Sequence, residues 1–473
     1  MSRWSVRIES VILDDFKNVK HGEINLENKK SVYKASLLGL YGQNGSGKTA
    51  LIDSINILRF ALSGKRIPNK YADFINVSSD FASLKFQFLL KKGESSYHAW
   101  YEFCIKRDTL QEDYDSQSIE ETMESSPKHK VTIFNECLKF QYSDENTKIR
   151  MGALIDTRNG EVFLPKSRYI ELVGSDKSTL TNILVAYKLA EERSQSFIFS
   201  RQLINTIRNE CKNEVYKALI NSLYTFGTRE LFVINTDNSG LISLNALPIA
   251  FKYKYADEHK ETFGQFAIPL NESVLVPVEL VDVVKELMNN MNIVLEQIIP
   301  GLKINVYESD TELFKDSKPG KHLQLMSVRN GKEIPLKYES EGIKKIVSIL
   351  QLLIVVYNSD SITLAVDELD AGIFEYLLGE LIKVISEKGK GQLIFTSHNL
   401  RPLETIDKSF IAFTTVNPNN RYIRFVNVKG NNNLRDFYYR DITLGEQSEP
   451  VYDPTNNYEI MLALREAGKT YDA

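Results

Sequence analysis

The sequence predicts an α/β fold, and three apolar runs that each end in polar residues are the observations that predict it. A glycine-rich loop at 42–49 follows the first run, and the loop is itself followed by residues with the apolar spacing of a helix. Asp367 and Glu368 end the second run, and His398 ends the third. We therefore expect remote parts of the chain to converge at one site.

The other runs set the order of the elements. Residues 6–40 alternate apolar and polar positions, which predicts sheet leading into the loop. Later alternating runs predict antiparallel strands at 83–90, 98–104, 131–134 and 136–140. The polar stretch 113–129 is expected to be an exposed loop.

Helical spacing begins near Thr179 and continues to Leu223. It returns from Val278 to Ile299, with Pro277 as a start signal. We expect a mostly helical insertion with a mixed segment, 231–276, inside it. No heptad is sustained long enough to predict a long coiled coil.

Composition sets limits on the class of protein. With 473 residues, 42% of them hydrophobic, the chain is long enough for two to three domains with large cores. A net charge of −4 gives no overall electrostatic footprint for nucleic acid or membrane, although local basic patches stay open. Three dispersed cysteines offer no disulfide framework or CxxC hook. With neither a signal core nor a long apolar stretch, we expect a soluble protein of the cytoplasm.

The glycine-rich loop carries the strongest chemical signal, because it meets the phosphate-loop pattern in the required strand-loop-helix context. Glycines let successive backbone N–H groups point at phosphate oxygens, Lys48 adds a cation, and the Thr49 hydroxyl suits Mg²⁺. The alternative is a mere glycine-rich turn. The candidate phosphate-binding residues are Gly42, Asn44, Gly45, Ser46, Gly47, Lys48 and Thr49.

Two weaker signals lie in the second half of the chain. The strand that ends in Asp367 and Glu368 has the Walker B form, in which Asp367 supports Mg²⁺ and Glu368 activates water. Solvated carboxylates also end many strands, and a lone histidine such as His398 is often only a capping residue. Ser340 and Gly342 open an apolar helix, either as a second anion-binding spot or as an ordinary N-cap.

Taken in order, these motifs resemble the ATP-binding-cassette ATPases of the structural-maintenance-of-chromosomes and overcoming-lysogenization-defect type. The resemblance implies ATP and Mg²⁺ as ligands, Thr49 and Asp367 at the metal, and Glu368 and His398 as catalytic base and switch histidine. It also implies that Ser340 and Gly342 touch the γ-phosphate of another subunit, with Asp370 at the dimer seam. The signature departs from that of transporters, because it reads Glu-Ser-Glu-Gly.

The same resemblance places Lys17 and Asn18 near the base and ribose, although a plain strand turn is the alternative. It divides the chain into three parts. Residues 1–170 form the N-terminal half of the ATPase head with its antiparallel β subdomain, 171–300 the mostly helical insertion, and 301–473 the C-terminal half with a tail. The head is expected to contain a mixed β-sheet.

Within this superfamily, the long insertion argues against a transporter subunit, and the missing coiled coil and CxxC argue against chromosome-maintenance and break-repair types. After His398, 75 residues follow (473 minus 398), too few for an appended nuclease domain. The tail 431–442 and the run 367–376 are similar to the AriA family, the ATPase subunits of the phage anti-restriction-induced defence system PARIS. The tail has a plainer alternative, packing on the last strand.

Two functions from different classes follow. The AriA resemblance implies a homo-oligomeric ATPase scaffold that holds a toxic nuclease, AriB, and releases it on sensing a phage anti-restriction protein. The alternative is a DNA-processing ATPase of the recombination-repair type, which the overall acidity does not favour. No membrane partner is expected.

Overall fold

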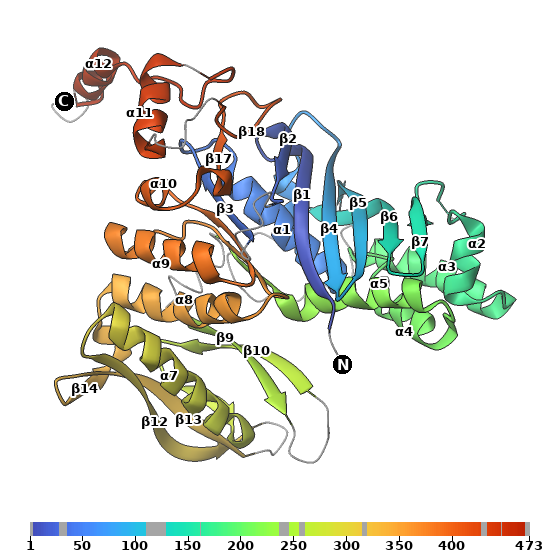
Figure 1. The fold of residues 1–473 in the computed structure, drawn as a ribbon, viewed down its shortest axis with the longest axis horizontal. Helices are drawn as coiled ribbons and strands as arrows, with labels where there is room; N and C mark the ends of the chain where they lie inside the picture. Colours follow the sequence, from blue (N-terminus) through green and yellow to red (C-terminus); the bar gives the residue numbers. More distant parts are fainter. Residues whose placement is uncertain are drawn as a thin grey trace, which may run out of the picture.

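A mixed six-stranded sheet lies at the centre of the computed structural model (Figure 1). The structure describes residues 3–27, 36–109, 129–160, 162–235, 246–254, 261–314, 319–426, 433–445 and 447–468. The strand order is β18-β17-β3-β16-β15-β8, in which all neighbours are parallel except β18 with β17. Its strands are β3 (Ser36–Tyr41), β8 (Leu231–Ile234), β15 (Thr363–Val366), β16 (Gln392–Thr396), β17 (Ile411–Thr414) and β18 (Tyr422–Ile423).

Both faces of this sheet are covered, which explains why its strands read as continuous apolar runs. In β3, Leu38 and Leu40 pack in one core with α1 and the N-terminal strands. Leu37 and Tyr41 point the opposite way, into a second core with α8 and α9. The helices are α1 (Lys48–Leu62), α8 (Glu341–Asn358) and α9 (Glu375–Lys388).

The N-terminal sheet is entirely antiparallel, in the order β2-β1-β4-β5-β6-β7. Its strands are β1 (Ser5–Phe16), β2 (Val19–Asn25), β4 (Phe81–Lys92), β5 (Ser95–Thr109), β6 (His129–Ser143) and β7 (Lys148–Asp156), and the 3₁₀ turn η1 (Asn69–Phe74) precedes β4. The runs predicted separately at 131–134 and 136–140 form one strand, β6, with Asn135 in the left-handed region (φ 54°) between them. The α/β class with an antiparallel N-terminal subdomain is confirmed. Of the loop predicted at 113–129, all but His129 lies outside the described residues.

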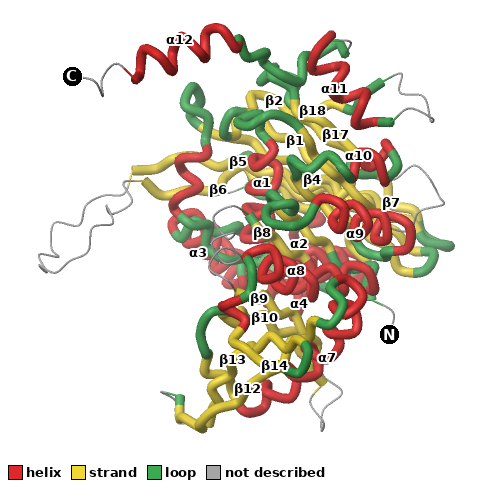
Figure 2. Tube along the Cα trace, turned by 90° about the vertical axis from the view of Figure 1, so that its left-hand side faces the viewer, coloured by secondary structure: helices red, strands yellow, loops and turns green. Residues whose placement is uncertain are grey.

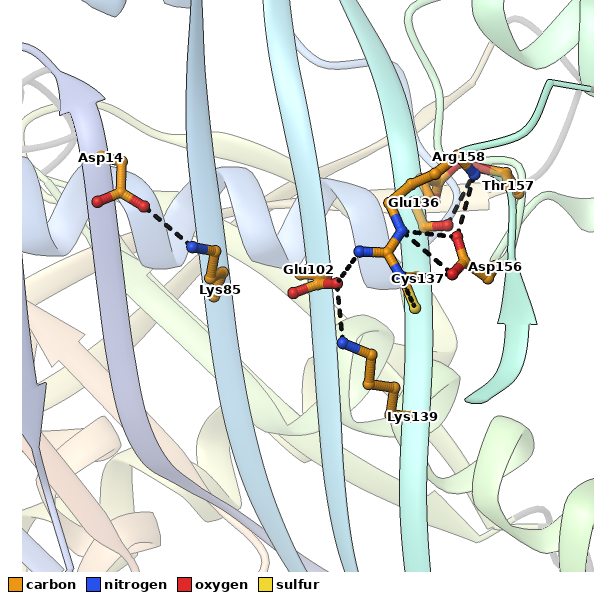
Figure 3. Close-up of polar contacts among 9 residues, drawn as sticks. All are labelled: Asp14, Lys85, Glu102, Glu136, Cys137, Lys139, Asp156, Thr157 and Arg158. Atoms are coloured by element: carbon orange, nitrogen blue, oxygen red, sulfur yellow. Dashed lines mark hydrogen bonds and ion pairs between the residues drawn. The ribbon is translucent and has the colours of Figure 1, made fainter. Parts of the chain in front are cut away.

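Ion pairs run from strand to strand across one face of this sheet (Figure 3). Asp14 of β1 pairs with Lys85 of β4 at 3.1 Å. Glu102 of β5 pairs with Lys139 of β6 at 3.1 Å and with Arg158 at 3.2 Å. Opposite charges on neighbouring strands stabilise a sheet by a few tenths of a kcal/mol to about 1 kcal/mol per pair. These pairs place acidic and basic side chains next to one another across the sheet.

Residues 171–300, expected as a mostly helical insertion, contain helices and also a strand of the central sheet. The helices beside the N-terminal sheet are α2 (Lys166–Val173), α3 (Lys177–Glu192), α4 (Arg201–Glu210) and α5 (Glu214–Thr225), followed by a π-turn, η2 (Phe226–Glu230). The strand β8 then pairs in parallel with β15 at the sheet edge. All four of its residues are buried, so the central sheet draws on this part of the chain as well.

A separate group of strands packs against α7, at the lower end of the molecule in Figure 1. Its order is β11-β13-β12, with β14 also paired to β13. The elements are β11 (Val274–Pro277), α7 (Val278–Ile298), β12 (Leu302–Leu313), β13 (Pro319–Arg329) and β14 (Lys332–Pro335), and the 3₁₀ turn η3 (Leu336–Tyr338) leads into α8. The hairpin of β9 (Ala246–Lys254) and β10 (Glu261–Pro269) lies nearby.

The C-terminal segment contains α10 (Pro402–Thr405), η4 (Lys408–Phe410), α11 (Leu434–Leu444) and α12 (Asn457–Gly468). In α11, the Tyr438 ring stacks on Phe413 of β17 with centroids 4.9 Å apart, which supports the plainer alternative that the tail packs on the last strand. Asn431 and Asn432 lie outside the described residues. Figure 2 shows α12 extending away from the body. None of the helices in the described ranges has the length and apolar character needed to cross a membrane.

Candidate functional site

The glycine-rich loop joins β3 to α1 and follows a path that requires glycine. Gly42, Gly45 and Gly47 have φ values of 153°, 74° and 94°. A Cβ on Gly42 would lie 1.8 Å from Thr414 Oγ1, so no larger residue fits between the loop and β17. Gly47 caps α1 in the left-handed conformation and directs the helix N-terminus at the loop.

Lys48, the first residue of α1, lies under the loop rather than extending into solvent. Its Nζ donates hydrogen bonds to the carbonyl oxygens of Gly42 at 2.8 Å and Gln43 at 3.0 Å. Burial lowers the pKa of Lys48, and the carboxylates of Asp367, Glu368 and Asp370 oppose that shift. The ammonium is therefore both fixed in place and close to acidic groups from the second half of the chain.

Ser46 has a structural contact inside the loop. Its hydroxyl donates to the Gln43 carbonyl at 2.6 Å and also contacts the hydroxyl of Thr414. Asn44 and Gly45, in contrast, are exposed at the loop tip. Ser46 thus ties the loop to β17, while its neighbours leave the backbone open to a ligand.

Asp367 and Glu368 directly follow β15 beside this loop, and one hydroxyl of β16 fixes both. Thr396 Oγ1 donates to Asp367 Oδ1 at 2.5 Å and accepts from the Glu368 backbone N–H at 2.8 Å. Asp367 is 1% exposed. Glu368 has a φ of 49°, a conformation that costs a non-glycine residue of order 1–3 kcal/mol and clusters at functional sites.

These groups line one pocket of about 290 Å³, close to the lower size limit of small-ligand sites. The two halves of the predicted site, remote in sequence, therefore meet in space. The pocket is lined by Lys17, Asn18, Asn44, Gly45, Gly47, Lys48, Thr49, Ala50, Asp367, Glu368 and His398. Gly42 and Ser46, also predicted as phosphate-binding residues, are not among these lining residues.

Asp370 acts on the backbone around His398. Its Oδ2 accepts from the N–H of His398 at 3.0 Å and of Asn399 at 2.9 Å. Asp370 is not among the described residues that line the pocket, but its carboxylate also acts electrostatically on Lys48. The two hydrogen bonds fix the backbone of the loop that carries His398, whose side chain is exposed and lines the pocket.

The predicted signature residues lie elsewhere on the surface. Ser340 caps α8, with its hydroxyl accepting from the Ile343 N–H at 3.4 Å. Gly342 lies against the turn at Gly372, where an added Cβ would be 2.5 Å from the Gly372 carbonyl oxygen. Neither Ser340 nor Gly342 is found among the lining residues of the pocket in their own chain.

Lys17 and Asn18 form the tight turn between β1 and β2 at the pocket wall. The Asn18 side chain donates to the Gly45 carbonyl, and the Lys17 ammonium pairs with Asp53 of α1. Arg421, which precedes β18, donates to the Asn18 carbonyl at 2.6 Å, and Tyr422 donates to the Gly47 carbonyl at 2.9 Å.

Several residues at the site were not predicted. Thr396 lies in an apolar run where a buried threonine is ordinary for a strand, so its sequence position carried no signal. Asp53 lies among the apolar residues of α1 and is 2% exposed. A carboxylate within an apolar helix is the signal in the sequence that could have identified it. Lys345 of α8 is also buried. Burial lowers its pKa, and the carboxylates of Asp370, Glu368 and Asp367 act against that decrease.

The cysteines contribute no chemistry to this site. All three are free, and burial raises the pKa of the Cys137 thiol to about 12. Cys137 lies beside Arg158 on the N-terminal sheet (Figure 3). A thiol with so high a pKa stays protonated at neutral pH and is a poor nucleophile.

Comparison with known proteins finds limited likeness. No family model matches the chain. A 214-residue stretch is 25% identical to the SbcC component of the nuclease SbcCD of Clostridium acetobutylicum, covering 44% of this chain and 17% of that protein. The chain thus spans less than a fifth of the length of that relative.

Among solved structures, similar chains include an Smc head bound to the C-terminal winged-helix domain of ScpA, the SMC head domain from Thermotoga maritima, and the recombination mediator protein RecF. The ScpA-bound Smc head is 13% identical, covering 88% of this chain and 96% of that chain, with a TM-score of 0.38. The Thermotoga head is 13% identical, and the match covers 89% of this chain and 99% of that chain, with a TM-score of 0.35. RecF is 12% identical, and the match covers 89% of this chain and 98% of that chain, with a TM-score of 0.37.

Proposed function

We propose that this chain binds ATP with Mg²⁺ and hydrolyses it to ADP and phosphate. The observation that carries the proposal is the shared pocket, in which a phosphate loop, two carboxylates and a histidine come together. The loop offers backbone N–H groups, and the helix N-terminus behind it favours negative charge. Lys48 supplies a positioned cation for the β- and γ-phosphates.

The residues available at the pocket fit Mg²⁺. Thr49 offers a hydroxyl and Asp367 a carboxylate, and Mg²⁺ in phosphate sites takes one or two carboxylates and leaves the rest to phosphate and water. Within the described ranges, no group of three or more His, Cys, Asp or Glu side chains could hold a metal by itself. Phosphates of a bound nucleotide would complete the shell of an ion held by Thr49 and Asp367. When bound, the ion neutralises charge on the transferred phosphoryl group.

The roles of the remaining residues follow from their positions. Glu368, at the pocket wall and held by Thr396, accepts the proton of the attacking water. The His398 ring, which lines the pocket, reaches the γ-phosphate once a nucleotide is bound. Asp370 keeps that histidine loop in place through its two backbone contacts.

Phosphate release by the purified full-length chain tests this proposal. With excess ATP and Mg²⁺, we expect steady turnover that falls to background when EDTA removes the metal and returns when Mg²⁺ is restored. Hydrolysis that continues unchanged in EDTA would contradict the assigned metal role of Thr49 and Asp367. A complete absence of nucleotide binding would refute the function itself.

The chain also functions, in this proposal, as a homo-oligomer in which Ser340 and Gly342 of one copy contact the γ-phosphate held by another. Two features support it. Ser340 caps a helix of 18 residues and remains exposed, so the helix N-terminus is open to an anion. Neither residue is among those that line the pocket of its own chain, which is compatible with the contact to another copy that the family resemblance implies.

Ser340→Asp tests this trans contact, because aspartate keeps the helix cap but places a negative charge beside the partner's triphosphate. In a Glu368→Gln background with MgATP, we expect this change to abolish self-association while leaving nucleotide binding intact. Ser340→Asn is the matched control, since it caps equally well without charge and should still assemble. Equal assembly of the two variants, measured by light scattering, would contradict the trans contact.

The biological role within this proposal is that of the AriA family, an ATPase scaffold that sequesters a toxic nuclease and releases it on sensing a phage anti-restriction protein. The similarity of the runs 367–376 and 431–442 to that family supports this role. The test is co-expression with the product of the neighbouring gene. A nuclease that co-purifies and becomes toxic when an anti-restriction protein is added would support the role, and the absence of any such neighbour would contradict it.

The similarity to the SbcC component of the nuclease SbcCD favours a second candidate, a DNA-processing ATPase of recombination and repair. A closed dimer would then grip duplex DNA, and affinity would fall steeply with salt. Binding of duplex DNA with a dissociation constant of about 1 µM or tighter at physiological salt would favour this candidate, since ordinary non-specific binding is weaker.

A further inference from the structure

A buried carboxylate behind the pocket holds the cation on the pocket wall. Asp53 of α1 is 2% exposed, and its Oδ2 pairs with the ammonium of Lys17. Its other oxygen, Oδ1, accepts a hydrogen bond from the Asn235 side chain at 3.0 Å. Asp53 itself is not among the residues that line the pocket, whereas Lys17 is.

The backbone of Lys17 is fixed as firmly as its side chain. Lys17 has a φ of 52°, a left-handed conformation that is unfavourable for a side chain of this kind. Its N–H donates to the Phe74 carbonyl, and its own carbonyl accepts from Asn76 Nδ2 at 2.7 Å. The ammonium also lies 3.8 Å from the centre of the Phe74 ring. A strained residue that its surroundings hold in this way is characteristic of functional sites.

The two partners of Asp53 come from different parts of the fold. Asp53 lies one helical turn after Thr49, so the two residues share a face of α1. Asn235 follows β8, and the Ile234 carbonyl just before it accepts the backbone N–H of Asp367 at 2.7 Å. The contact chain from Lys17 through Asp53 to Asn235 therefore connects the N-terminal turn, the phosphate-loop helix and the edge strand beside the Asp-Glu pair.

We infer that Asp53 is a positioning residue for nucleotide binding, which, with Asn235, holds the Lys17 ammonium at the wall of the nucleotide pocket. The inference rests on the proposed ATP site. An untethered lysine side chain must lose rotamer freedom each time a ligand binds, whereas a lysine already fixed by a buried ion pair has lost it beforehand. Asp53 acts from behind the wall and does not face the ligand.

A double-mutant cycle tests the inference, with binding of Mg²⁺ and the non-hydrolysable analogue AMPPNP to the full-length chain as the readout. Asp53→Asn keeps the shape and removes the charge, and Lys17→Met keeps most of the stem and removes the ammonium. We expect each change to weaken binding by about tenfold, within the range for coupled neighbours, and the double variant to bind no more weakly than Lys17→Met alone. Wild-type affinity in Asp53→Asn, or losses that multiply in the double variant, would overturn the inference.

The control is another buried polar contact of the same helix. Asn56 donates to the Tyr71 hydroxyl at 2.6 Å, one turn further from the pocket than Asp53. Tyr71→Phe removes this bond, and we expect the affinity for AMPPNP to stay unchanged. An equal loss in Tyr71→Phe and Asp53→Asn would show that general loosening of α1 causes both, and would also overturn the inference.

Some of these variants are expected to be less stable. Lys17→Met alone leaves the Asp53 carboxylate buried without its cation, which is strongly destabilising, whereas the double variant removes both charges. Asn235→Ala is therefore kept as a further variant in case Asp53→Asn misfolds. If Asp53→Asn does not fold, Asn235→Ala leaves the ion pair in place and should weaken binding about threefold, again only when Lys17 is present. A loss that is independent of Lys17 would refute the inference.

The Lys48→Ala variant separates failure of the inference from failure of the proposed site. If Lys48→Ala binds AMPPNP normally, the proposed ATP site itself is wrong. If Lys48→Ala loses binding but the Asp53 and Asn235 variants bind normally, only the positioning role is wrong.

Discussion

Lys48→Ala should lower the affinity for MgATP at least about a hundredfold, equivalent to about 3 kcal/mol of binding free energy. The change removes the cation that the phosphate loop contributes to the pocket. It also leaves the Gly42 and Gln43 carbonyls without the ammonium that now bridges them, which loosens the loop. Calorimetric titration with AMPPNP and Mg²⁺ measures the effect.

Lys65→Ala is the matched control, because Lys65 is exposed and follows the C-terminal end of α1, whereas the loop lies at the N-terminal end of that helix. It should bind nucleotide as the wild-type chain does. Unchanged affinity in Lys48→Ala, with a normal melting temperature, would contradict the assignment of the loop as the phosphate site. Comparable losses in both variants would point to a general charge effect.

Glu368→Gln should keep MgATP bound while slowing hydrolysis by about 10²–10⁴-fold, the usual contribution of a general base. Glutamine has nearly the same shape, and the contact that fixes this residue, from its backbone N–H to Thr396, does not involve the side chain. Because the triphosphate then persists, assemblies that depend on it should accumulate. Phosphate release and AMPPNP affinity, measured on the same preparation, separate chemistry from binding.

Glu387→Gln on the exposed side of α9 provides the control for loss of one carboxylate. Its turnover should equal that of the wild-type chain. If Glu368→Gln turns over at the wild-type rate, Glu368 is not the base. If it loses nucleotide affinity as well as turnover, its role is in binding rather than in proton transfer.

The phosphate loop was predictable because its geometry is local. The glycines, Lys48 and Thr49 lie within eight consecutive positions, between a continuous apolar run that forms β3 and the helical apolar spacing of α1. The Asp-Glu pair was predictable for a related reason, since it directly ends an apolar strand. That it meets the loop in one pocket depends on strand order, in which β16 lies between β3 and β15.

The residues that fix these groups were harder to find. Thr396 binds both Asp367 and Glu368 across a strand pair, and nothing in its own surroundings in the sequence distinguishes it from a strand threonine. The ion pair of Asp53 with Lys17 joins residues 36 positions apart, so it depends on tertiary packing. The four-residue strand β8 is too short for its apolar run to reveal that it joins the central sheet.

The central claim is that the loop and the Asp-Glu pair grip one metal-bound triphosphate. A crystal or cryo-EM structure of the Glu368→Gln chain with ATP and Mg²⁺ tests it most directly. We expect the β- and γ-phosphates within hydrogen-bond distance of Lys48 and the loop N–H groups, with the ion between Thr49 and Asp367. A triphosphate bound elsewhere, or bound at the loop with its metal away from Asp367, would contradict the claim.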